Sequence, residues 1–92
     1  MEPVFTHDEN LRLFIAELEG HQATVAYRPV DKTTLDFQST YVPHVLRGRH
    51  VGTQLVRYAL NWAKERGLRV VPSCWFVGSV VERHPEYREM LV

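Results

Sequence analysis

The segment from Val51 to Arg66 has the periodicity of one amphipathic α-helix, and this segment constrains the fold more than any other. Its apolar residues recur every three or four positions, so they fall on one face of a helix. Gly67 is a typical residue just after a helix end, and the neighbouring lysine and arginine suit the negative end of the helix dipole. The stripe consists of Val51, Leu55, Ala59, Trp62 and Ala63, with Val56 and Leu60 beside it. We therefore expect one long helix that buries this face.

Patterns typical of β-strands precede the helix. Alternating side chains predict strands over about 11–16, 22–30 and 33–42, with a turn at Glu19-Gly20-His21. Pro43 ends the third of these strands. The three strands are expected to form an antiparallel meander.

After the helix, the short apolar run Leu68–Val71 predicts a buried strand, and Trp75–His84 predicts a second amphipathic helix that Pro85 ends. The tail, residues 86–92, is too short to assign. The predicted order is β-β-β-α-β-α, an α+β fold in which a meander leads into one βαβ unit. Because such crossovers are right-handed and parallel, the strands on either side of the long helix should be parallel neighbours.

Composition restricts the class of protein further. We expect a single domain over the 92 residues. The formal net charge is zero, with 11 basic and 11 acidic residues, which argues against a nucleic-acid partner. Cys74 is the one cysteine, so an internal disulfide is impossible and a reducing compartment is favoured. With no signal-peptide pattern and no long apolar run, we expect a cytoplasmic protein without a membrane partner. The histidine spacing predicts no metal site, and a monomer or weak dimer is expected.

The start of the long helix is unusual. Segment 47–52 carries two arginines, two glycines and a histidine where helices commonly have a capping side chain and acidic residues. Positive side chains at a helix N-terminus are unfavourable unless an anion is bound there. A phosphate would suit the site, because it can interact with the backbone N–H groups, the helix dipole and the arginines together. Glycine would let the backbone approach such a ligand closely. The alternative is a plain turn with two solvated arginines.

These residues and several others resemble GNAT acyltransferases, which bind the pyrophosphate of coenzyme A with Arg/Gln-x-x-Gly-x-Gly/Ala between a strand and a helix. Here the frame reads Arg47-x-x-His50-x-Gly52. The chain from Phe14 onward is similar to the small, single-domain, YjdJ-like GNAT domains. The segments that carry the likeness are Thr40-Tyr41-Val42-Pro43, Leu46–Val56, Gly67–Cys74 and Arg83-His84-Pro85-Glu86-Tyr87.

The resemblance implies an acetyl-CoA-dependent N-acetyltransferase whose acceptor is an unidentified amine. Two positions depart from the family: His50 replaces the first glycine of the loop, and Ser39 replaces a common histidine. The implied binding residues for acetyl-CoA are Val42, Leu46, Arg47, Gly48, Arg49, His50, Val51, Gly52 and Thr53.

Cys74 and Tyr87 are the predicted catalytic residues. Cys74 lies between the buried strand and the second helix, where a helix N-terminus would lower its pKa and favour a nucleophilic thiolate. The resemblance also points to this cysteine, although a lone cysteine is as often a small core residue. Tyrosine commonly protonates the leaving thiolate in the wider superfamily, but the resemblance does not give that role to Tyr87, and packing is its alternative. Transfer directly from the thioester to the amine is the competing mechanism.

Two other functions stay open from the sequence. A non-catalytic acyl-CoA-binding or interaction module on the same fold is suggested by His50. A nucleic-acid patch at Arg47, Arg49, His50 and Arg57 is less favoured, because the net charge is zero and no aromatic array is interleaved with the basic residues.

Overall fold

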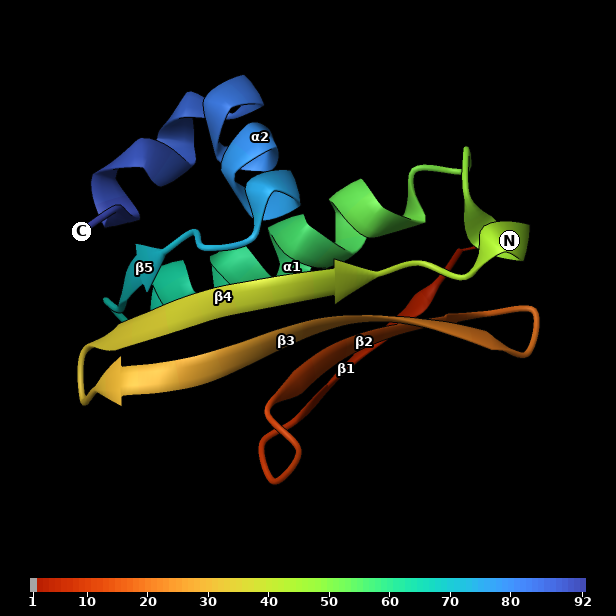
Figure 1. The fold of residues 1–92 in the computed structure, drawn as a ribbon, viewed down its shortest axis with the longest axis horizontal. Coiled ribbons are helices and arrows are strands. Elements are labelled where there is room, and N and C mark those ends of the chain that lie inside the picture. The colour runs from red at the N-terminus through yellow and green to blue at the C-terminus, as the bar shows by residue number, and fades with distance from the viewer. Residues whose placement is uncertain (1) are drawn as a thin grey trace.

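The computed structural model describes residues 2–92, which form a five-stranded sheet and two α-helices (Figure 1). Two short 3₁₀ helices complete the fold. In chain order the elements are β1 (Val4–Asp8), β2 (Leu13–Leu18), β3 (His21–Asp31), β4 (Thr34–Tyr41), η1 (His44–Leu46), α1 (Val51–Glu65), β5 (Arg69–Val71), α2 (Trp75–Arg83) and η2 (Pro85–Met90).

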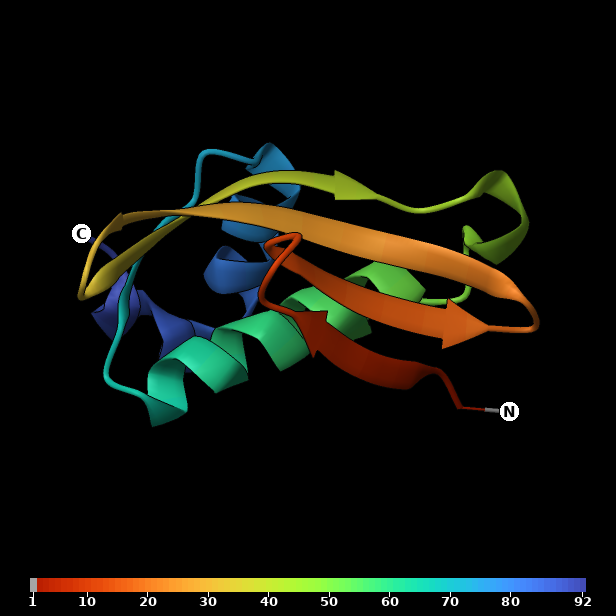
Figure 2. The same ribbon diagram turned by 90° about the horizontal axis from the view of Figure 1, so that it is seen from below.

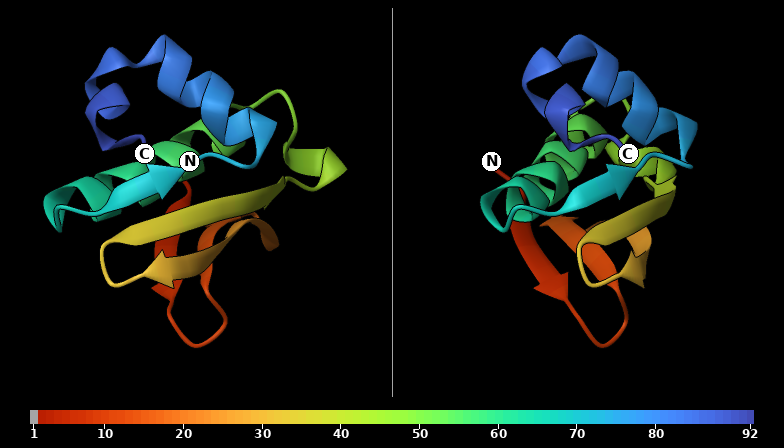
Figure 3. Two further views of the ribbon diagram at one scale, coloured as in Figure 1. Left: turned by 60° about the vertical axis from the view of Figure 1, so that its left-hand side comes forward. Right: turned by 90° about the vertical axis from the view of Figure 1, so that its left-hand side faces the viewer.

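The strands lie in the order of the sequence, β1-β2-β3-β4-β5. The first four are antiparallel, and β4 pairs with β5 in parallel through three residue pairs. This confirms the predicted α+β class and the parallel strands on either side of the long helix. Both α-helices cover the same face of the sheet (Figure 3), and α1 crosses β1 and β2 obliquely (Figure 2).

The predicted strand order was wrong at the N-terminus, because β1 was missed and β2 begins at Leu13 rather than near Leu11. Leu11 lies in the turn between these strands and is 65% exposed. In β1, Phe5 stacks on Tyr58 and His7 stacks on Phe14, with ring centroids 5.1 and 4.0 Å apart. A five-residue strand with a polar side chain on its inner face shows no clear alternation of apolar residues, so sequence reasoning passed over it.

The core lies between α1 and the sheet, as the apolar stripe predicted. Every residue of that stripe is buried except Trp62, which is partly buried under Arg66. Gly67 has φ +68°, and the N–H of Leu68 donates to the carbonyl of Ala63 at 3.0 Å, which closes the helix in a Schellman turn. The helix therefore ends where glycine can take the left-handed conformation.

β4 separates from β5 soon after they pair. Their last pair is Asp36 with Val71. On its other side, β4 pairs Ser39 with Ala26 but Phe37 with Tyr27, so Gln38 is an extra residue in a β-bulge. The C-terminal half of β4 is thus left without a partner strand on the side toward β5, and the two α-helices begin beside it.

No helix within residues 2–92 is both long and apolar enough to cross a membrane. The same residues contain no group of three or more His, Cys, Asp or Glu side chains arranged to hold a metal ion.

The pH dependence of stability should include a contribution from His7. Its Nε2 lies 2.6 Å from the hydroxyl of Tyr27, and burial lowers its pKa from the ordinary value of 6.5, with Arg66 also lowering it and Glu9 and Asp8 opposing. Since folding favours the neutral imidazole, this contribution is lost as the pH falls below about 6.5. We expect the free energy of unfolding of the wild type to fall more steeply between about pH 7 and 5 than that of His7→Phe, which keeps the stacked ring. Urea unfolding at several pH values measures both slopes, and parallel curves would contradict this origin.

Candidate active site

The loop before α1 takes a sharp path that its residues explain. Arg47 donates from Nε to the carbonyl of Val42 at 3.1 Å, which holds the loop against the end of β4. Gly48 has φ +78° and His50 has φ +63°, so both lie in the left-handed region. Glycine takes this conformation freely, whereas in histidine it is strained. His50 thus stands at a backbone position that glycine would suit better.

The first turn of α1 has unpaired backbone donors. His50 is the N-cap, makes no side-chain capping bond, and no acidic residue lies in the first turn. Its carbonyl accepts the first helical bond, from the N–H of Gln54 at 3.0 Å. The N–H groups of residues 51–53 therefore point outward from a positive helix end, as the sequence indicated. Such an end binds an anion.

A pocket of about 470 Å³ opens at this helix end. All the residues predicted to bind acetyl-CoA line it except Arg49. Three residues of α2, which the prediction did not include, form its opposite wall. The lining residues are Val42, Leu46, Arg47, Gly48, His50, Val51, Gly52 and Thr53 with Trp75, Phe76 and Arg83.

The side chain of Arg49 was predicted to face the anion, and here the structure differs. Both of its terminal nitrogens donate to Glu19, each at 2.9 Å. This hydrogen-bonded pair lowers the pKa of the exposed Glu19 carboxyl. Arg49 thus joins the loop to the β2–β3 turn, a contact between residues 30 positions apart that sequence could not show.

The structure also gives Gly52 a role different from the predicted one, which was to let the backbone approach a ligand closely. A Cβ at this position would lie 3.1 Å from a methyl group of Val42 and 3.2 Å from the ring of Phe76. The glycine therefore lets α1 pack against Val42, which follows β4, and against α2. The space that a side chain at position 52 would occupy is already filled by Val42 and Phe76.

Cys74 is held at the junction between β5 and α2, where the sequence placed it. It is the N-cap of α2, and its N–H donates to the carbonyl of Phe37 in β4 at 2.9 Å. Its Sγ lies 3.4 Å from the hydroxyl oxygen of Thr40, also in β4. The thiol is partly buried and faces the free part of β4.

The environment of Cys74 favours its thiolate. Burial raises the pKa of the thiol, but hydrogen bonds from the Thr40 hydroxyl and from the backbone of Val77, Phe76 and Thr40 together lower it further than burial raises it. The net pKa lies below the ordinary value. The Thr40 hydroxyl contributes most to lowering the pKa, and the backbone donors at the N-terminus of α2 add to it in the direction that the sequence analysis expected.

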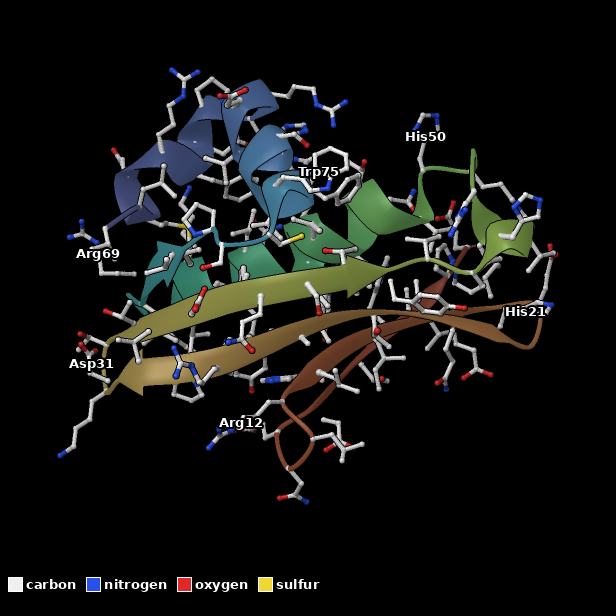
Figure 4. All side chains as sticks on the ribbon, viewed as in Figure 1. Arg12, His21, Asp31, His50, Arg69 and Trp75 are labelled. Carbon is white, nitrogen blue, oxygen red and sulfur yellow. The ribbon has the colours of Figure 1, made fainter. Side chains whose placement is uncertain are left out.

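The thiol and the anion site belong to adjoining pockets. A smaller pocket of about 210 Å³ is lined by Thr40, Val42, Arg47, Cys74, Trp75 and Phe76. Four of these residues, Val42, Arg47, Trp75 and Phe76, also line the larger pocket. Figure 4 shows Trp75 and His50 on the same side of the sheet. The two pockets form one groove between the free part of β4 and the starts of both α-helices, with the unpaired N–H groups of α1 at one end and the Cys74 thiol at the other.

The structure does not bring Tyr87 to this groove. Its side chain is 1% exposed, and its hydroxyl donates to Oδ1 of Asn61 at 2.9 Å and accepts a longer bond from Arg57 at 3.4 Å. Neither pocket includes it among its lining residues. Tyr87 is therefore a core residue that connects η2 to α1 through its hydrogen bonds. This is the packing role that was the alternative to catalysis.

Sequence reasoning missed Thr40 and the α2 wall. Phe76 and Arg83 are seven positions apart, so the helical period places them on one face, but the sequence does not show which element that face meets. Trp75, the first residue of α2, is 79% exposed and lines both pockets.

The model of the GCN5-related N-acetyltransferase family matches residues 12–90. Protein NATD1 of Danio rerio is 33% identical over 90 residues, which cover 94% of this chain and 82% of that protein. Human protein NATD1 is 34% identical over 89 residues, covering 92% and 79%. A solution structure from Staphylococcus aureus described as GCN5-like superposes with a TM-score of 0.74 and 25% identity, over 97% of this chain and 87% of that one. The chain belongs to the GCN5-related N-acetyltransferase family, which confirms the resemblance to GNAT acyltransferases.

Removing the hydroxyl beside Cys74 should reduce its reactivity. In Thr40→Val the thiolate loses one hydrogen-bond donor, so we expect the pKa of Cys74 to rise and alkylation by iodoacetamide at neutral pH to slow severalfold. The pH–rate profile of alkylation measures this directly. The control is Ser39→Ala, an exposed neighbour in β4. Unchanged midpoints in Thr40→Val, or equal shifts in both variants, would show that the hydroxyl does not support the thiolate.

Proposed function

We propose that this protein is an acetyl-CoA-dependent N-acetyltransferase that transfers acetyl groups to an amine through Cys74. The observation that carries the proposal is the pair of adjoining pockets, which places an anion site and a thiol of lowered pKa in one groove. Membership of the GCN5-related family supports the acetyl-transfer class.

The larger pocket fits the coenzyme A half of the substrate. Unpaired N–H groups at the start of α1 and the nearby Arg47 suit the pyrophosphate. Val42, Leu46 and Phe76 provide apolar contacts for the chain that leads toward the thiol. A volume of about 470 Å³ lies within the usual range for small-molecule sites.

The smaller pocket favours a covalent route. It contains neither a carboxylate nor an imidazole among its lining residues, so Cys74 is the group there best suited to act as nucleophile. The Cys74 thiolate attacks the thioester carbonyl; an S–C bond to Cys74 forms, the bond to the coenzyme sulfur breaks, and coenzyme A leaves as a thiolate that takes up a proton. A neutral acceptor amine then attacks the acetyl-cysteine, forming the amide, releasing the Cys74 thiolate and giving up one proton to solvent.

A second function, non-catalytic binding of acyl-CoA, is favoured by one observation. His50 holds a strained left-handed conformation where the family usually has glycine, and this residue is among those that line the larger pocket. An imidazole at position 50 leaves a phosphate less room to approach the backbone of the loop than glycine would. On this alternative the protein binds the thioester without turning it over.

The direct test is incubation with acetyl-CoA in the absence of any acceptor. We expect one acetyl group on the wild-type protein, mapped by mass spectrometry to Cys74 and removed by hydroxylamine. Cys74→Ala should bind acetyl-CoA within about twofold of the wild-type affinity, because the anion site is separate, but should gain no acetyl group. A screen of free amines and peptides, with released coenzyme A as the readout, then identifies the acceptor.

Two outcomes would contradict the covalent proposal. Near-normal turnover by Cys74→Ala would indicate direct transfer to the amine. Tight binding of acetyl-CoA without acetylation or turnover in the full screen would indicate the non-catalytic function.

His50→Gly should bind acetyl-CoA as tightly as the wild type or more tightly. Glycine relieves the left-handed strain, worth about 1–2 kcal/mol, and costs about 0.5–1 kcal/mol in chain entropy, so the free energy of unfolding should rise by about 1.5 kcal/mol or less. Calorimetric titration measures the affinity and urea unfolding the stability. His50→Ala is the matched control, because it removes the imidazole but keeps the strained backbone. Weaker binding by His50→Gly than by His50→Ala would show that backbone strain does not limit this site.

A further inference from the structure

Arg83 lines the larger pocket but is not part of the anion site at the start of α1. That site therefore does not account for the presence of this positive side chain. Arg47, the other arginine that lines this pocket, comes from the loop before α1. Arg83 comes from the last turn of α2 on the opposite wall. The pocket therefore carries positive charge on two walls.

The guanidinium of Arg83 has donors to spare. Within the described residues it forms no salt bridge with any carboxylate. Its contacts are long hydrogen bonds to the carbonyl and the hydroxyl of Ser79, at 3.4 and 3.5 Å. A guanidinium carries five N–H donors in a fixed fork that matches a phosphate group. Arg83 can thus bind an anion without first breaking an ion pair.

The position of Arg83 separates it from the helix end that suits the pyrophosphate. Phe76 packs directly against Gly52 in the first turn of α1. Arg83 lies on the same face of α2 seven residues later, which corresponds to about 10 Å along the helix. A ligand that reaches both places needs a second anionic group set apart from the first.

We propose that Arg83 binds the 3′-phosphate on the ribose of coenzyme A and makes the pocket selective for thioesters that carry this phosphate. The inference rests on the proposed function, because it takes coenzyme A as the occupant of the larger pocket. Coenzyme A has this chemistry: a pyrophosphate and, across one ribose, a phosphate monoester with about −1.5 to −2 charges near neutral pH. A bidentate bond between arginine and phosphate is one of the stronger hydrogen-bonded contacts.

The test compares the dissociation constants of coenzyme A and 3′-dephospho-coenzyme A at one fixed salt concentration. We expect the wild type to bind coenzyme A about tenfold more tightly, a typical effect of one charge-assisted contact. Arg83→Gln should bind the two ligands equally, with its affinity for dephospho-coenzyme A unchanged from the wild type. Arg83→Lys should keep part of the preference, because it keeps the charge but not the fork.

Arg88→Gln is the matched control. It removes the same charge from the neighbouring η2, where Arg88 donates to the carbonyl of Glu82 and lines a different pocket. This variant should keep the tenfold preference. A wild type without preference, or an Arg83→Gln variant that loses affinity equally for both ligands, would overturn the assignment while leaving the proposed function standing. No binding of either ligand to the wild type would overturn both.

Discussion

The N–H of Cys74 donates a 2.9 Å hydrogen bond to the carbonyl of Phe37, and the arrangement of the groove depends on this contact. It joins the residue that caps α2 to β4, just beyond Asp36 and Val71, the last pair between β4 and β5. The bond fixes the start of α2 beside β4 and brings the thiol to Thr40. Because α1 and α2 cover the same face of the sheet, both helices begin next to the free part of β4.

Each helix start then contributes to the chemistry. The first turn of α1 offers unpaired N–H groups without any capping side chain, which suits an anion. The first turn of α2 supplies donors that lower the pKa of Cys74 against the opposing effect of burial. Gly52 lets the two helices and the segment just after β4 approach closely, since its missing side chain leaves room for Val42 and Phe76. Packing and chemistry thus meet at the same few residues.

Local patterns predicted most of this arrangement. The apolar stripe predicted α1, and Gly67 predicted where this helix ends. The position of Cys74 between a strand and a helix predicted that its thiol lies at a helix N-terminus. Contacts between distant parts of the chain could not be predicted in the same way. Arg49 turns to Glu19 across 30 positions, and Tyr87 enters the core although its residue type suits catalysis. The strand β1 escaped notice because its inner face carries His7, whose polar ring is stabilised by stacking that only the folded chain provides.

Titration of ¹⁵N-labelled protein with acetyl-CoA tests the central claim most directly, because each backbone N–H reports its own surroundings. The account predicts that the largest changes in amide chemical shift occur at residues 48–53 and at Phe76 and Val77, where the two helices begin. The β1–β2 turn, which lies outside both pockets, should change little. Changes concentrated away from the two helix starts, or none at saturating acetyl-CoA, would contradict the account.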